Sequence, residues 1–110
     1  MRSNGPNGQS CSGDGSLLFN GSSNGTHSKT FACSGSGPFA AAANVGSGQV
    51  TITVKDGAGA QVYGHTFKGP GQEGDSTQLS GASGTWTITA TRAGSTFGSF
   101  SGQYSAGVNC

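Results

Sequence analysis

Residues 50–55 read VTITVK and residues 85–91 read TWTITAT, and these two stretches decide the fold. In both, apolar and polar residues alternate at every second position, which is the period of a β-strand with one buried face. Asp56-Gly57 follows the first stretch directly and is a typical turn pair. The same period recurs in five further stretches, residues 17–19, 31–33, 39–45, 61–68 and 100–108. We therefore predict an all-β protein.

The composition supports this fold class and excludes others. Of the 110 residues, 22 are glycine and 3 are proline, too many turn-forming residues for a helical bundle. Only 8% of residues are charged, and the net charge is +1. The few basic residues are spread along the chain, so neither nucleic acid nor an anionic membrane is expected as a partner. No apolar run approaches the roughly 20 residues that cross a bilayer, so no transmembrane segment is expected.

About eight short strands separated by glycine-rich turns are typical of an antiparallel β-sandwich or jelly roll. We expect residues 16–110 to form this domain. Residues 1–15 are rich in Asn, Gly and Ser, and we expect them to form a flexible N-terminal arm that acts as a connector. The predicted core consists of the large side chains on the buried faces of the strands: Leu17, Phe19, Phe31, Phe39, Val50, Ile52, Val54, Val62, Phe67, Trp86, Ile88, Phe100, Tyr104 and Val108.

Four local features carry specific expectations. Asn24-Gly25 predicts a tight hairpin turn between the first two strands, with His27 in or beside it. Residues 40–43 are all alanine, and the preceding proline and the β context favour a strand there over a helical turn. Gly64 is expected to mark a bulge, because the alternation changes parity within residues 61–68. A short strand is expected around residues 77–79.

The three cysteines are Cys11 on the arm, Cys33 at the end of a predicted strand and Cys110 after the last one. A bridge between Cys33 and Cys110 would tie the last strand into the sheet and leave Cys11 to link subunits in an oxidising compartment. Two other connectivities stay open: Cys11 pairs with Cys33 and leaves Cys110 as the linking thiol, or all three form intersubunit bonds. A further alternative is three reduced thiols in the cytoplasm.

The titratable residues form no catalytic pattern. The candidates are dispersed along the chain: Asp14, His27, Asp56, His65, Glu73 and Asp75. No nucleophile-elbow, Walker or zinc-ligand motif is present, so neither an enzyme nor a bound metal is predicted. The acidic residues beside glycines offer oxygen ligands to calcium, but the same residues are ordinary turn formers, and no cofactor is required.

Two sets of side chains are candidates for ligand contact. Tyr63 and Phe97 are the aromatic residues expected to face a ligand such as a sugar. A second set would present a regular hydroxyl surface to ice, sugar or a partner, although threonine also simply suits the wet face of a strand. This second set is Thr51, Thr53, Thr85, Thr87, Thr89 and Thr91.

Residues 48–63 (GQVTITVKDGAGAQVY) and 81–92 (GASGTWTITATR) resemble small exported bacterial β-sandwich modules, the pre-peptidase C-terminal domains and proprotein-convertase P domains. The resemblance implies an exported, non-catalytic β-sandwich. An arm ending at Cys11, followed by Cys33 and Cys110, is also similar in architecture to fibre subunits of the endospore-appendage kind. That second likeness is one of layout rather than of strand sequence.

These features lead to a main hypothesis and an alternative. The main hypothesis is a structural subunit of an extracellular or cell-surface fibre, which assembles with copies of itself through sandwich packing, the arm and intersubunit disulfides. The alternative is a secreted carbohydrate- or ligand-binding β-sandwich module. Residues 1–11 lack the apolar segment of a signal peptide, so we expect a leader that was removed or replaced, or assembly without one.

Overall fold

The computed structural model describes residues 16–21, 24–94 and 98–110, and for residues 16–21 it describes the backbone only. The described residues form β-strands and turns without a helix, as expected for an all-β protein. The expected arm, Cys11, Asp14 and Phe97 lie outside the described residues. The strands follow one another as β1 (Ser16–Gly21), β2 (Gly25–Cys33), β3 (Ser36–Ser47), β4 (Gln49–Lys55), β5 (Gln61–Lys68), β6 (Gly71–Ser80), β7 (Gly84–Ala93) and β8 (Ser101–Val108).

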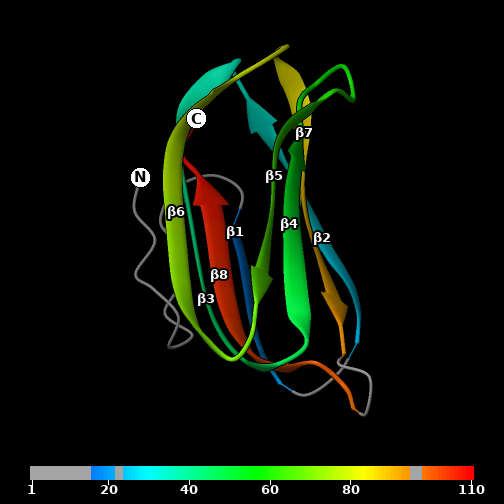
Figure 1. The fold of residues 1–110 in the computed structure, drawn as a ribbon. Helices are drawn as coiled ribbons and strands as arrows, with labels where there is room; N and C mark the ends of the chain where they lie inside the picture. Colours follow the sequence, from blue (N-terminus) through cyan, green and yellow to red (C-terminus); the bar gives the residue numbers. More distant parts are fainter. Residues whose placement is uncertain (1–15, 22–23, 95–97) are drawn as a thin grey trace.

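The strands form two four-stranded antiparallel sheets that lie face to face (Figure 1). The first sheet has the order β1-β8-β3-β6, and the second has the order β2-β7-β4-β5. This interleaving of strands far apart in sequence is the arrangement of an eight-stranded jelly roll, so the predicted fold class is confirmed. Within the described residues, the structure contains no helix that is long and apolar enough to span a membrane.

The core lies between the sheets and contains most of the residues that the alternation assigned to it, together with Val45 and Leu79, which were not assigned to it. Phe31 and Val62 are only partly buried, and the side chains of Leu17 and Phe19 are not described. Small residues add to the predicted set, because Ala41, Ala43 and Ala106 also face inward and are buried. The largest fully buried side chains are Trp86, Tyr104, Phe39, Phe67, Phe100, Ile52 and Ile88.

The predicted first hairpin is wrong. β1 pairs with β8 in the first sheet, and β2 pairs with β7 in the second, so the chain crosses between sheets near Asn24-Gly25. His27 consequently lies within β2, where it pairs with Ala90, and not in a turn. The Asn24 side chain instead accepts a hydrogen bond from the backbone N–H of Phe100 at 2.9 Å. This contact ties the start of β2 to the chain that enters β8.

Two other local expectations are refined by the strand register. The register of β4 on β5 shifts between Val54 and Lys55, opposite Val62, so the bulge lies two residues before Gly64. The run of alanines is part of β3, as favoured, and this strand is twelve residues long. The short strand expected around residues 77–79 extends to the ten residues of β6, which form one edge of the first sheet.

One end of the sandwich is held together by the peptide groups around Ala82, in the loop between β6 and β7. The N–H of Ala82 donates to Asp56 Oδ2 at 2.9 Å, and its carbonyl accepts from the N–H of Gly57 at 3.0 Å and from the Trp86 indole at 2.7 Å. Asp56 Oδ1 accepts from the N–H groups of Ala58 and Ala60 within its own turn. The Asp-Gly turn therefore packs on the β6–β7 loop so closely that a Cβ at Gly57 would collide with the backbone of that loop.

The same end carries a disulfide between Cys33 and Cys110. Cys33 closes β2 in the second sheet, whereas Cys110 follows β8 in the first sheet, so the bond connects the two sheets. This is the pairing that the cysteine positions favoured. The bond closes a loop of 77 residues.

We expect this disulfide to provide a large share of the stability. In the chain-entropy description, a loop of 77 residues contributes about 4–5 kcal/mol, which is comparable to the whole stability of many small domains. Urea titrations should therefore give a free energy of unfolding lower by about that amount for Cys33→Ser. The matched control is Cys11→Ser, which leaves the bond intact. Equal stability of Cys33→Ser and the wild type would contradict the prediction.

Asp56 should make the protein sensitive to acid. The N–H of Ala82 is the largest influence that lowers the pKa of this carboxyl below 3.8, and the N–H groups of Ala60, Ala58 and Gly59 act the same way while burial opposes them. A lowered folded-state pKa stabilises the fold above pH 3.8, and this contribution is lost as the pH falls through the folded-state value. Thermal melts should show Asp56→Asn less stable than the wild type at neutral pH, with the difference narrowing in acid. A pH-independent difference would refute this.

Candidate functional site

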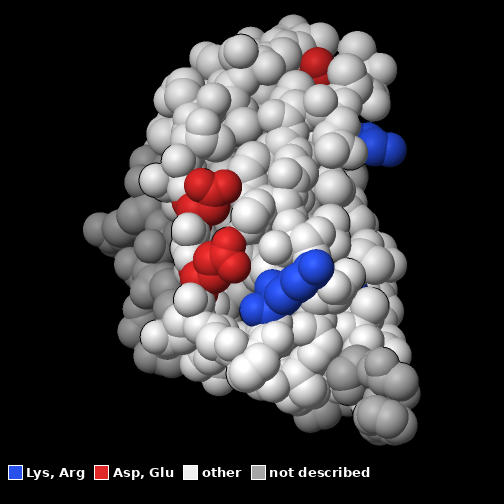
Figure 2. Space-filling view, in the orientation of Figure 1, with Lys and Arg blue, Asp and Glu red and all other residues white. Residues whose placement is uncertain are grey.

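Polar side chains meet where the edge strands of the two sheets come together, β5 from the second sheet and β6 from the first. Tyr63 and His65 have the inward parity of β5, because they pair with the buried residues Val54 and Ile52. Asp75 and Glu73 have the inward parity of β6, where they pair with Ala41 and Ala43. Figure 2 shows two acidic groups side by side on this face of the molecule, with a third apart from them near the top. We call Tyr63, His65, Glu73 and Asp75 the edge site.

Tyr63 and Asp75 form the more buried half of the edge site. The Tyr63 hydroxyl donates to Asp75 Oδ2 at 2.8 Å, and the ring packs on Phe39 with the ring centroids 4.3 Å apart. Burial of the Tyr63 hydroxyl raises its pKa far above the usual range, and the hydrogen bond to Asp75 acts in the same direction. The Tyr63 side chain thus links the edge of the second sheet to the first sheet and to the core.

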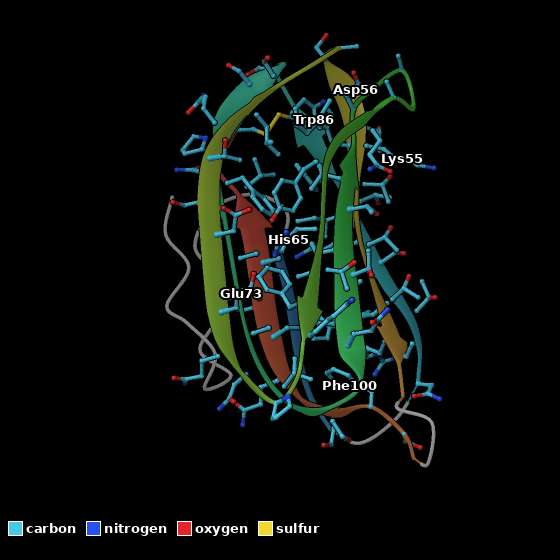
Figure 3. The ribbon with its side chains drawn as sticks, in the orientation of Figure 1. Lys55, Asp56, His65, Glu73, Trp86 and Phe100 are labelled. Atoms are coloured by element: carbon cyan, nitrogen blue, oxygen red, sulfur yellow. A yellow bond between two sulfur atoms is a disulfide. The ribbon has the colours of Figure 1, made fainter. Side chains whose placement is uncertain are left out.

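His65 and Glu73 form the more exposed half. His65 Nε2 lies 2.6 Å from Glu73 Oε2, and their side chains are 38% and 47% exposed. The imidazole also packs against the buried Phe67 ring in an edge-to-face contact, with the ring centroids 4.6 Å apart. His65 and Glu73, both labelled in Figure 3, lie between β5 and β6, with His65 directed toward Glu73. A ligand approaching this edge therefore meets a positioned imidazole and a solvent-accessible carboxylate.

Each carboxylate of the edge site retains hydrogen-bonding capacity. Asp75 and Glu73 use one oxygen each for Tyr63 and His65, and the second oxygens make no hydrogen bond within the described part of the chain. A shallow open depression of about 500 Å³ lies on the outer face of the first sheet, because most of its lining residues have the outward parity of β3 and β6. It is lined by Ala40, Ala41, Ala42, Gly74, Asp75 and Ser76. The depression therefore opens on the face of β6 opposite to the edge site.

The other residues singled out in the sequence are not brought to this site. Asp56 is committed to the turn and loop described above, and His27 lies on β2 at the opposite edge of the second sheet. Among the described residues, no group of three or more His, Cys, Asp or Glu side chains is arranged to hold a metal ion.

Of the two aromatic residues expected to face a ligand, the described structure contains only Tyr63, and it lies half-buried at the edge site. Its partners were not predicted. Glu73 and Asp75 were read as turn formers, although their spacing of two residues places both on one face of a strand. Tyr63 and His65 have the same spacing. This shared period was the signal in the sequence that two facing pairs were possible.

Comparison with known proteins finds solved structures with a similar fold but no matching family. No protein-family model matches the sequence, and no curated protein matches it. The fold is similar to a carbohydrate-binding module, CBM36, solved with calcium and xylotriose. That match has a TM-score of 0.53 at 10% identity and covers 84% of this chain and 78% of the module.

Two further solved structures match less closely. The CBM36-1 domain of a multidomain xylanase from the hindgut metagenome of Trinervitermes trinervoides matches with a TM-score of 0.47 at 16% identity, over 94% of this chain and 89% of that one. FlgD from Xanthomonas campestris, whose structure was solved for insights into the hook capping essential for flagellar assembly, matches with a TM-score of 0.38 at 22% identity, over 86% of this chain and 68% of that one. The resemblance to pre-peptidase and P domains is thus supported only as a β-sandwich, and the appendage likeness has no family match.

The edge site should delay ionisation of tyrosine in the folded protein. The chain has two tyrosines, and burial raises the pKa of both Tyr63 and Tyr104 above 10.0. A raised folded-state pKa stabilises the fold below pH 10.0, and this contribution is lost as the pH rises further. The tyrosinate absorbance band should therefore appear only as the protein unfolds in alkali, and Tyr63→Phe should weaken the dependence of stability on alkaline pH. Tyrosinate absorbance near pH 10.0 in a protein that is still folded would rule this out.

Proposed function

We propose that this chain is a non-catalytic β-sandwich module that binds a carbohydrate at the edge site. The observation that carries the proposal is the meeting of two carboxylates, an imidazole and a phenol hydroxyl from both sheets at one partly exposed edge of the sandwich. Sugars present many hydroxyl groups, each of which donates and accepts hydrogen bonds. The edge site offers both kinds of partner within one small area.

The proposed contacts divide between donors and acceptors. The second oxygens of Glu73 and Asp75 would accept hydrogen bonds from sugar hydroxyls, and hydrogen bonds to charged groups are about twice as strong as neutral ones. His65 lies beside them as a further polar partner. Tyr63 and Phe67 would keep these groups in place from the side of the core. This chemistry orients hydroxyl groups and requires no bond to be broken, which agrees with a binding role and not an enzymatic one.

Two further observations favour this function. The CBM36 module with a similar fold was solved with xylotriose, so a sandwich of this kind is compatible with sugar binding. The disulfide between Cys33 and Cys110 is typical of proteins in oxidising surroundings, and we propose that the module acts outside the cell. Calcium was present in the same CBM36 structure, so Glu73 and Asp75 are the residues of the edge site at which a calcium effect would be sought.

The fibre-subunit hypothesis remains a prediction. It depends on Cys11 and on the arm of residues 1–15, which lie outside the described residues. The edge site therefore favours the carbohydrate-binding alternative.

Affinity electrophoresis in gels containing xylan, β-glucan, galactan or mannan tests the proposal, with and without calcium. We expect the wild type to be retarded by at least one of these polysaccharides. Glu73→Gln and Asp75→Asn should each weaken binding by about 10- to 100-fold, because a hydrogen bond to a charged group contributes about 1.5–3 kcal/mol. Both substitutions preserve shape and still accept the hydrogen bond from His65 or Tyr63.

The matched control is Gln78→Ala, an exposed position on the same strand that pairs with Pro38 on the outward face. This variant should bind like the wild type. If all variants are retarded equally, the carbohydrate does not bind at the edge site. If no polysaccharide retards the wild type, with or without calcium, the proposed carbohydrate binding is wrong.

A further inference from the structure

The outer face of the second sheet carries rows of hydroxyl side chains, and the first of them crosses all four strands. Thr91 on β7 pairs with Thr26 on β2 and with Thr51 on β4, and Thr51 pairs with Thr66 on β5. Residues paired in this way project from the same face of a sheet. One unbroken row of four threonines therefore runs across the sheet, from one edge strand to the other.

A second row lies beside the first, two residues further along each strand. Thr89 pairs with Ser28 and with Thr53, and this row ends at Gly64 on β5. A shorter third row follows, in which Thr87 pairs with Thr30 and with Lys55. We call the hydroxyl residues of these three rows the Thr face: Thr26, Ser28, Thr30, Thr51, Thr53, Thr66, Thr87, Thr89 and Thr91.

The sheet gives the Thr face a two-dimensional repeat. Neighbouring strands lie about 4.8 Å apart, and residues two apart along a strand lie about 6.8 Å apart. The register shift in β4 falls after Val54, so the first two rows are free of bulges. The repeat is therefore regular across the part of the face that carries the most hydroxyls.

The side chains of the Thr face are held in fixed orientations. Threonine is β-branched and stiff about χ1, so each hydroxyl and methyl group holds its place. Hydrogen bonds between side chains add to this, because Thr51 Oγ1 lies 2.8 Å from Thr66 Oγ1 and Ser28 Oγ lies 3.2 Å from Thr89 Oγ1. All these residues are exposed or half-exposed, so the array is presented to solvent.

The chemistry of the Thr face restricts what it can bind. Its first two rows contain no charged side chain, so they offer nothing to a polyanion or an acidic peptide. They also contain no aromatic ring, the group that supplies stacking area against a sugar. Each threonine instead presents one methyl group and one hydroxyl at a regular interval. Such a face suits a ligand that is itself a neutral, hydrogen-bonding lattice.

We propose that the Thr face binds ice. Ice is an uncharged lattice of water molecules, and the first two rows, which carry no charged side chain, meet it without the cost of desolvating a charge. The hydroxyl groups would take the places of lattice waters in its hydrogen bonds, and the methyl groups would occupy the spaces between them. The fixed side chains lose little entropy on binding, because their orientations are already set. The proposal does not depend on the edge site, whose side chains have the inward parity of their strands.

The experiment measures partition of the protein into a slowly growing ice hemisphere, together with thermal hysteresis. We expect the wild type to enter the ice and to give faceted crystals with measurable hysteresis. Thr89→Lys and Thr53→Lys place a charge at the centre of the Thr face and should abolish both effects. Thr53→Val keeps the shape but removes a hydroxyl, and it should lower the hysteresis without affecting the fold.

The control Thr77→Lys adds the same charge at an exposed position on β6 in the other sheet, and it should behave like the wild type. Circular dichroism and thermal melts identify any variant that fails to fold. If the lysine variants do not fold, the lower hysteresis expected for Thr53→Val tests the proposal. The proposal is overturned if the wild type is excluded from ice, or if Thr77→Lys is as damaging as Thr89→Lys. It is also overturned if the wild type binds crystalline cellulose through Thr89 and not ice, because the face would then recognise a polysaccharide surface.

Discussion

One residue, Ala82, makes through its N–H and its C=O the hydrogen bonds on which the closed end of the sandwich depends. It connects the β4–β5 turn through Asp56 and Gly57, and it holds the indole of Trp86, the largest buried side chain, at the end of the core. The loop that carries Ala82 leaves β6 in one sheet and enters β7 in the other. One loop thus sets how the sheets approach each other where Asp56 and Trp86 lie close together in Figure 3.

Much of the fold was predictable because its central strands have one buried and one wet face. β4 and β7 were evident from alternation alone, whereas β6 was mostly missed because it lies at an edge and buries little besides Leu79. In β3 the buried positions between Phe39 and Val45 are filled by alanine, so its apolar pattern is weaker than that of β4 or β7. The first hairpin failed for another reason. Asn24-Gly25 fits a tight turn locally, but pairing with β7 and β8 over long distances in sequence determined which sheet each strand joined.

The residues of the candidate site were recognisable in the sequence, but which of them contact one another was not. Tyr63, His65, Glu73 and Asp75 were each noted from the sequence, yet nothing local indicates that β5 and β6 face each other across the open edge of the sandwich. That proximity follows from the jelly-roll connection, which carries the chain from one sheet to the other between these strands. The threonine rows were likewise only partly predictable, because the register alone shows that hydroxyl residues of β2 and β5 extend the rows of β4 and β7.

The position of the disulfide also determines how the molecule would respond to mechanical load. Cys110 lies two residues beyond the end of β8, and its partner Cys33 lies at the end of β2 in the opposite sheet. Tension applied to the chain at Cys110 would pass through a covalent bond into β2, so β8 would not be peeled from β1 and β3 one hydrogen bond at a time. The last strand, which lies between two neighbours, is thereby shielded from unzipping at its own C-terminal end.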